Sequence, residues 1–149
     1  MNPLFVGIDV SRRNNVAYLM NPDGSKHSSF SVQNNLVGAK LLSERIVSAL
    51  SSMQLSDVMI GLEATSIYGN SLVYALREDG SLGQFHRKIH ILNPKQVKKF
   101  KEAYPDLPKN DFVDAFVTVS YTHQMCIRDR SKRCATIIDK LGVFWWISI

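Results

Sequence analysis

Four acidic residues stand at positions where a charged side chain is costly without a partner. Asp111 and Asp114 are three residues apart in the otherwise apolar stretch "PKNDFVDAFV", residues 108–117. Residues at this spacing share one face of a helix, and aligned carboxylates are tolerated when a cation lies between them. Asp9 lies within the apolar segment "FVGIDVS", and Glu63 ends the apolar segment "VMIGLE". A carboxylate in a buried strand is unfavourable unless it is paired or bound to a metal ion.

Together these carboxylates would make an oxygen-rich site. Oxygen ligands favour magnesium or manganese over zinc. Two such ions, about 3.5–4 Å apart, can activate a nucleophile and stabilise the leaving oxygen in phosphoryl transfer. We therefore predict a Mg²⁺ or Mn²⁺ site formed by Asp9, Glu63, Asp111 and Asp114. The alternative is a structural role for each acid: Asp111 would favour a helix start through the helix dipole, and acids such as Glu63 are common at strand ends.

A basic segment, "HRKIHILNPKQVKKFK" at residues 86–101, separates Glu63 from the aspartate pair. The net charge of the whole chain is only +5, so this local concentration matters more than the total. Clustered Lys and Arg suit the phosphate backbone of a nucleic acid, and the alternative is a solvated helix face. The candidate nucleic-acid-binding residues are Arg87, Lys88, Lys95, Lys98, Lys99 and Lys101.

The hydrophobic pattern predicts an α/β fold that could position these residues. It begins with an antiparallel meander of strands at 4–11, 16–20 and 27–33, with a turn at "NPDGS", 21–25. The later elements are a helix over 36–51 capped by Asn34 or Asn35, a strand at 57–64, a helix over 66–80, a strand at 88–93, a helix from Pro94 and a helix opening near Asn110. This order is typical of a mixed sheet covered by helices. A parallel neighbour of the first strand would bring Glu63 beside Asp9, with the last helix across both.

The composition suits one domain with a real core, since the chain has 149 residues and 45% of them are hydrophobic. No apolar run reaches the roughly 18–20 residues of a membrane helix. The N-terminus lacks the charged start and cleavage site of a signal peptide, so we expect a cytoplasmic protein without a membrane partner. Cys126 and Cys134 have no CxxC spacing, and neither a zinc site nor a disulfide framework is predicted.

The ordered segments "FVGIDVS", "IGLEATSIYG", "ILNPKQVKKF" and "KNDFVDA" carry a family resemblance. The chain resembles the DEDD transposases of bacterial insertion sequences, the insertion-sequence one-hundred-and-ten family, also called bridge-RNA-guided recombinases. The resemblance covers about residues 4–117 and implies a ribonuclease H-like, RuvC-like fold. It matches the four DEDD acids to Asp9, Glu63, Asp111 and Asp114. The family often reads Lys-Thr-Asp where this chain reads Lys109-Asn110-Asp111, a mild change at a helix cap.

The resemblance implies an enzyme, a transposase that exchanges DNA strands to move an insertion element. It implies Mg²⁺ or Mn²⁺ as cofactor, DNA as substrate, a guide RNA as partner and a homo-oligomer as the full-length assembly. The family also has a C-terminal domain whose catalytic serine forms the covalent link to DNA. We expect that domain to be absent here. Ser11, Ser66 and Ser71 lie outside the matching motif and are not candidates for the catalytic serine. The chain alone would then be inactive in strand exchange.

The family pattern stops after "DAFVTV". The pieces "VSYTH" and "MCIRDRS" resemble peptides that arise when sequencing-adapter DNA is translated, which predicts an artefactual junction near residues 117–119. We therefore expect a RuvC-like domain at 1–118 and a non-native or disordered tail at 119–149.

Three other functions remain open. One is a catalytically inactive nucleic-acid-binding fragment, which the expected lack of the serine domain favours. Another is a ribonuclease H-type nuclease or junction resolvase, which shares the four acids and would cut DNA with magnesium alone. A third is an actin-like ATPase or sugar kinase, for which "GIDVS" would be a phosphate loop. That fold needs a second, Gly-rich phosphate loop, and the sequence contains none.

Overall fold

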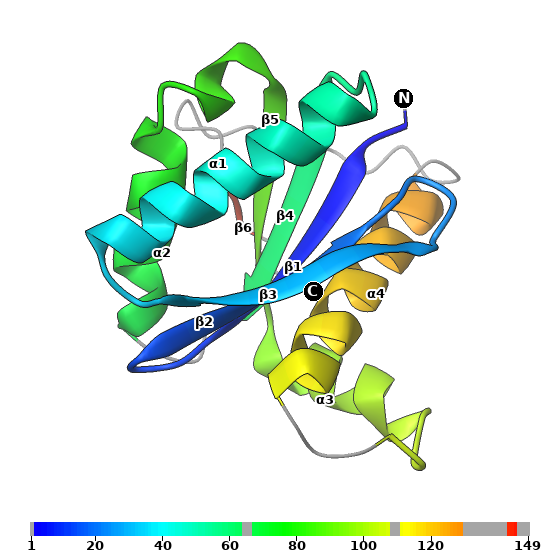
Figure 1. The fold of residues 1–149 in the computed structure, drawn as a ribbon. Coiled ribbons are helices and arrows are strands. Elements are labelled where there is room, and N and C mark those ends of the chain that lie inside the picture. Colours follow the sequence, from blue (N-terminus) through cyan, green and yellow to red (C-terminus); the bar gives the residue numbers. More distant parts are fainter. Residues whose placement is uncertain (1, 64–66, 108–110, 130–142, 146–149) are drawn as a thin grey trace.

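A computed structural model describes residues 2–63, 67–107, 111–129 and 143–145, which form one mixed β-sheet with helices on both faces (Figure 1). The sheet has the strand order β3-β2-β1-β4-β5-β6. Its strands are β1 (Leu4–Val10), β2 (Asn14–Met20), β3 (Lys26–Gln33), β4 (Asp57–Glu63), β5 (His86–Leu92) and β6 (Val143–Trp145). β2 pairs antiparallel with β1 and β3, whereas β4 is parallel to both β1 and β5. The predicted meander followed by alternating helices and strands is confirmed.

The turn between β2 and β3 follows the predicted signal. Gly24 has a φ of 90°, a backbone conformation that glycine adopts at little cost. Its N–H donates to the carbonyl of Asn21 at 2.9 Å and closes the turn. The Asp23 side chain accepts from the Ser25 N–H at 2.9 Å. The Asp-Gly pair therefore favours a turn here because of the glycine backbone conformation and these two hydrogen bonds.

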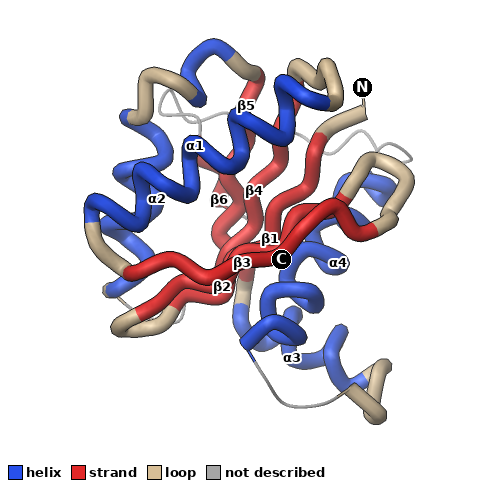
Figure 2. The backbone as a smooth tube through the Cα atoms, viewed as in Figure 1, coloured by secondary structure: helices blue, strands red, loops and turns tan. Residues whose placement is uncertain are grey.

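The helices lie in two layers. α1 (Leu36–Ser52) and α2 (Tyr68–Glu78) cover one face of the sheet, while α4 (Asp111–Asp129) crosses the other face with α3 (Pro94–Glu102) packed against it (Figure 2). A short 3-10 helix, η1 (Leu82–Gln84), precedes β5. Asn35 caps α1 by accepting from the Gly38 N–H at 2.8 Å, and Asn93 caps α3 by accepting from the Lys95 N–H at 3.0 Å. No helix in the described residues is long and apolar enough to span a bilayer.

Alternate residues of the central strands enter two separate cores. The predicted apolar stripe of α1 is fully confirmed, since Ala39, Leu42, Ile46, Ala49 and Leu50 are all buried. This stripe packs against the β1 and β4 side chains of one face, Leu4, Val6, Ile8, Val58, Ile60 and Leu62. On the opposite face Phe5 and Met59 pack against Val119 of α4. This two-sided burial explains why both strands read as continuous apolar runs.

Two glycines let α4 lie close to the sheet. Gly7 of β1 and Gly61 of β4 are partners in the parallel register. A Cβ on Gly7 would lie 2.5 Å from the carbonyl oxygen of Ala115 and 2.6 Å from the Cβ of Val119, far inside van der Waals contact. A Cβ on Gly61 would collide with the Thr122 hydroxyl. The two glycines therefore allow the α4 backbone to pack directly against the sheet.

Some predicted boundaries differ from the observed ones. β5 begins at His86 rather than residue 88, because the His86 N–H donates to the Ser56 carbonyl and the strand pairs with β4 from that point. α2 ends at Glu78, two residues before Gly80. The predicted domain boundary after residue 118 falls within α4, where Val119 and Thr122 are buried. The predicted cap Asn110 lies outside the described residues, as do 130–142 and 146–149 of the predicted tail.

Candidate functional site

Asp9 and Glu63 stand side by side at the carboxyl ends of two parallel strands. The register of β1 and β4 pairs Ile8 with Leu62, and each acid is the next residue along its strand. Side chains alternate along a strand, so Asp9 shares the face of Gly7, on which α4 lies. Glu63 follows Gly61 in the same way. Both acids are partly buried.

α4 contributes the third acid. Asp114 is adjacent to Ala115, whose carbonyl oxygen approaches Gly7 of β1. The pKa of the Glu63 carboxyl is raised by burial and, second, by the negative charge of Asp114, while the Lys101 ammonium lowers it. Glu63 and Asp114 are therefore close enough for their charges to interact. The structure thus places Asp9 beside Glu63, and Glu63 near Asp114. Their shared role as metal ligands stays a prediction.

Asp111, the fourth predicted acid, is the first residue of α4. Its side chain lies outside the described part of the structure. Its backbone stands one helical turn before Asp114, at the end of α4 where the helix dipole favours negative charge. Its role as a metal ligand stays a prediction.

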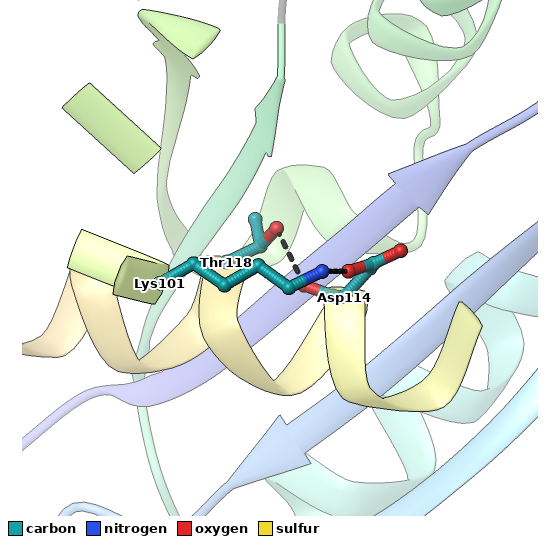
Figure 3. A network of polar contacts seen from close by, with 3 residues as sticks. All are labelled: Lys101, Asp114 and Thr118. Carbon is teal, nitrogen blue, oxygen red and sulfur yellow. Dashed lines mark hydrogen bonds and ion pairs between the residues drawn. The ribbon is translucent and has the colours of Figure 1, made fainter. Parts of the chain in front are cut away.

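Lys101 enters the acidic site from α3. Its ammonium donates to Oδ1 of Asp114 in a short ion pair (Figure 3). The Thr118 hydroxyl donates to the main-chain carbonyl of Asp114 at 2.9 Å, one turn along the helix. The sequence predicts a phosphate-binding role for Lys101, and the structure places its ammonium beside Asp114. Sequence reasoning missed this pair because it depends on how α3 packs against α4.

The other basic residues do not form one patch. Lys95, Lys98 and Lys99 are exposed on α3, at a spacing that places them on one helix face. Lys88 is partly buried within β5.

Arg87 lies near the start of β5, whereas α3 follows the end of that strand. Its guanidinium donates to the carbonyls of Arg77 and Asp79, the latter at 3.2 Å, where α2 ends. The Arg77 carbonyl is one that a helix end leaves without an intrahelical partner, whereas the Asp79 carbonyl also accepts from the Gly83 N–H at 3.1 Å. Arg87 therefore has a structural contact that the sequence pattern did not predict.

The chemistry of the donor set fits a hard divalent cation. Asp9, Glu63 and Asp114 offer carboxylate oxygens, the ligands that Mg²⁺ and Mn²⁺ prefer. As they stand, no three potential ligands among the described residues are arranged as a metal cluster. Asp114 Oδ1, a natural ligand atom, is engaged by the Lys101 ammonium.

The sequence of the chain matches a known family. The chain matches the model of the IS110-type DEDD transposases, described as "Transposase", over residues 6–133. The chain belongs to this transposase family. Among curated proteins no match is found.

Solved structures of low sequence identity are similar to this chain. RuvC of T. thermophilus in complex with a Holliday junction substrate is 13% identical, with a TM-score of 0.54 over 85% of this chain and 95% of that one. The Fowlpox virus resolvase in complex with Holliday junction DNA is 12% identical, with a TM-score of 0.46 over 87% of this chain and 99% of that one. The RuvC match confirms the predicted ribonuclease H-like, RuvC-like fold.

The raised pKa of Glu63 predicts a pH effect on stability. A folded-state pKa above the ordinary 4.5 means that the native state holds this proton more tightly than the unfolded chain. The stabilisation is fully present below pH 4.5 and is lost as pH rises through the folded-state pKa. In EDTA, the free energy of unfolding of Glu63→Gln should therefore increase relative to that of the wild type as pH rises above 4.5.

Urea unfolding at a series of pH values measures this difference. Glu44→Gln, an exposed residue of α1 on the other face of the sheet, is the matched control and should track the wild type. A wild-type minus Glu63→Gln difference that is constant with pH would contradict the prediction.

Proposed function

We propose that this chain is the metal-binding catalytic domain of a transposase that exchanges DNA strands to move an insertion element. The observation that carries the proposal is the convergence of Asp9, Glu63 and Asp114, from β1, β4 and α4, on one face of the sheet. Membership of the transposase family supports a catalytic role for these acids. Asp111, at the start of α4, is proposed as the fourth acid.

In this proposal the four acids hold Mg²⁺ or Mn²⁺. Bound at these carboxylates, such ions supply nucleophile activation and stabilisation of a leaving oxygen in phosphoryl transfer. Asp9 and Glu63 sit on paired strands, so their backbones are rigid, and Asp114 is held by a helix packed on glycines. Rigid supporting elements keep catalytic groups in place without cost at the moment of reaction.

The direct test is a calorimetric titration of Mg²⁺ and of Mn²⁺ into the wild-type chain. Saturable binding that EDTA reverses is expected. Absence of heat at millimolar metal, with the fold intact by circular dichroism, would overturn the metal-binding part of the proposal.

DNA is the proposed substrate, with a guide RNA and a second copy of the protein as further partners. Membership of the transposase family supports DNA, and the exposed lysines of α3 offer positive charge beside the acidic site. The guide RNA and the oligomer rest on the family resemblance.

A junction resolvase or ribonuclease H-type nuclease is the second candidate, favoured by the shared fold with RuvC. Labelled four-way junctions and linear duplexes, incubated with the chain and Mg²⁺, separate the two. A resolvase cuts the junction with metal alone. The transposase domain by itself is expected to bind both DNAs without cutting either, and the inactive fragment would bind them without needing metal.

The α3 lysines lead to a salt-dependence prediction. Each phosphate contact contributes about 0.9 to the slope of log affinity against log salt concentration on duplex DNA. Replacing Lys95, Lys98 and Lys99 together by Gln should therefore reduce the magnitude of the slope by nearly three times this amount. Fluorescence anisotropy with a labelled duplex at several salt concentrations measures it.

Lys40→Gln removes one exposed charge from α1, on the other face of the sheet, and should leave the slope unchanged. An unchanged slope in the triple variant would show that these α3 lysines do not contact the DNA phosphates.

A further inference from the structure

Lys101, in the basic 86–101 segment, is paired with an acid of the site. It lies in the last turn of α3, and its ammonium reaches Oδ1 of Asp114 on α4 (Figure 3). Its positive charge also acts on Glu63, the neighbour of Asp114. Lys101 thus occupies the electrostatic position that a bound cation would take.

We propose that Lys101 is a built-in counter-ion of the acidic site, which pairs with Asp114 when no divalent cation is bound and must leave that carboxylate when one binds. The inference rests on the proposed metal-binding function. It assigns Lys101 a positioning role on the ligand Asp114, in place of the phosphate contact that its neighbours suggest.

The backbone that carries Lys101 is well anchored. Val97 of α3 is 3% exposed and packs in a cluster that includes Val117 of α4. Phe100 stacks at an angle on Tyr121 of α4, with ring centroids 5.7 Å apart. The exchange therefore requires motion of the Lys101 side chain alone.

The Lys101 side chain can make that motion. It is 34% exposed and Asp114 is 38% exposed, so the pair borders solvent. A lysine stem is long and flexible, and partly exposed ion pairs are weak compared with the attraction of a divalent cation to carboxylates. The Lys101–Asp114 ion pair can therefore form when no metal is bound and be displaced by a divalent cation.

The two roles of Lys101 act in opposite directions on measurable quantities. Without metal, the ammonium offsets the repulsion between Glu63 and Asp114 and stabilises the fold. With metal present, it competes for Asp114 and lowers the apparent affinity. A lysine whose charge lies away from the site carboxylates would not strengthen metal binding when replaced.

The experiment compares the wild type with Lys101→Met, which keeps most of the side-chain length without the charge, and Lys101→Arg, which keeps the charge. Lys40→Met on α1 is the matched control. Thermal midpoints are measured in EDTA and Mn²⁺ dissociation constants by calorimetry. Lys101→Met should melt at a lower temperature in EDTA and bind Mn²⁺ about 5-fold more tightly, the change expected from losing one competing ion pair.

Lys101→Arg and Lys40→Met should stay close to the wild type. Wild-type binding of Mn²⁺ with unchanged or weaker binding by Lys101→Met would overturn the counter-ion proposal and leave the metal-binding function standing. If neither protein binds Mn²⁺, the proposed function itself fails. The two failures are therefore distinguishable in one set of titrations.

Discussion

Asp9→Asn is expected to weaken Mg²⁺ and Mn²⁺ binding by at least about 100-fold, because removing only the hydrogen-bonding partners of metal ligands already costs about 10–100-fold. Asn keeps the size and one oxygen of the side chain but loses its negative charge. The effect is large because Asp9 stands on a strand, beside Glu63 in the β1–β4 register, so the sheet fixes its carboxylate at the site. Calorimetry with either metal measures the change.

Asp114→Asn should weaken metal binding to a similar degree for a different geometric reason. Asp114 is carried by α4, so its loss leaves Asp111 as the proposed ligand of that helix, while both strand acids remain. Glu44→Gln, which removes an acid of α1 from the far side of the sheet, should leave affinity unchanged. Equal binding by Asp9→Asn, Asp114→Asn and the wild type would refute the site.

The helices and strands, and the placement of Asp9 and Glu63 on strands, can be predicted from local sequence patterns. The α1 stripe at Ala39, Leu42 and Ile46 repeats with the period of a helix, and such a period survives in any fold that buries one face. The acids could be grouped because parallel strands present their carboxyl ends at one edge. That inference needs only the strand order, and the alternation of apolar segments already suggests a parallel pair.

The basic residues could not be assigned in the same way. Lys101 and Arg87 belong to one basic run, yet one pairs with Asp114 and the other donates to carbonyls at the end of α2. Both partners come from tertiary packing, and a charge run carries no information about which member will meet a carboxylate. The continuation of α4 past residue 118 depends on buried contacts with glycines on two distant strands, which the local sequence does not reveal.

Those glycines lead to the second large effect, a loss of stability in Gly7→Ala. The atoms that a new Cβ would meet are backbone atoms of α4, at Ala115 and Val119, which cannot rotate away. Overpacking of this kind costs about 1–3 kcal/mol or more. Urea unfolding measures it, and Gly80→Ala is the matched control because nothing lies within 4 Å of its added Cβ.

Gly61→Ala sharpens the comparison, because its Cβ would meet the Thr122 side chain first. Adding Thr122→Ala removes the colliding hydroxyl and should recover much of the stability. Adding Val119→Ala to Gly7→Ala should recover little, since the backbone obstruction remains. Equal recovery in the two double variants would show that α4 does not rest on Gly7 as described.

Gly7→Ala should also weaken metal binding although no acid is changed. The only way to relieve the collision is for α4 to move away from β1, and Asp114 moves with Ala115. Glu63 and Asp9 stay with the sheet, so the carboxylates separate. Calorimetry with Mn²⁺ at a temperature where the variant is folded tests this link. A destabilised but folded Gly7→Ala that binds Mn²⁺ like the wild type would mean that the site does not depend on how closely α4 approaches the sheet.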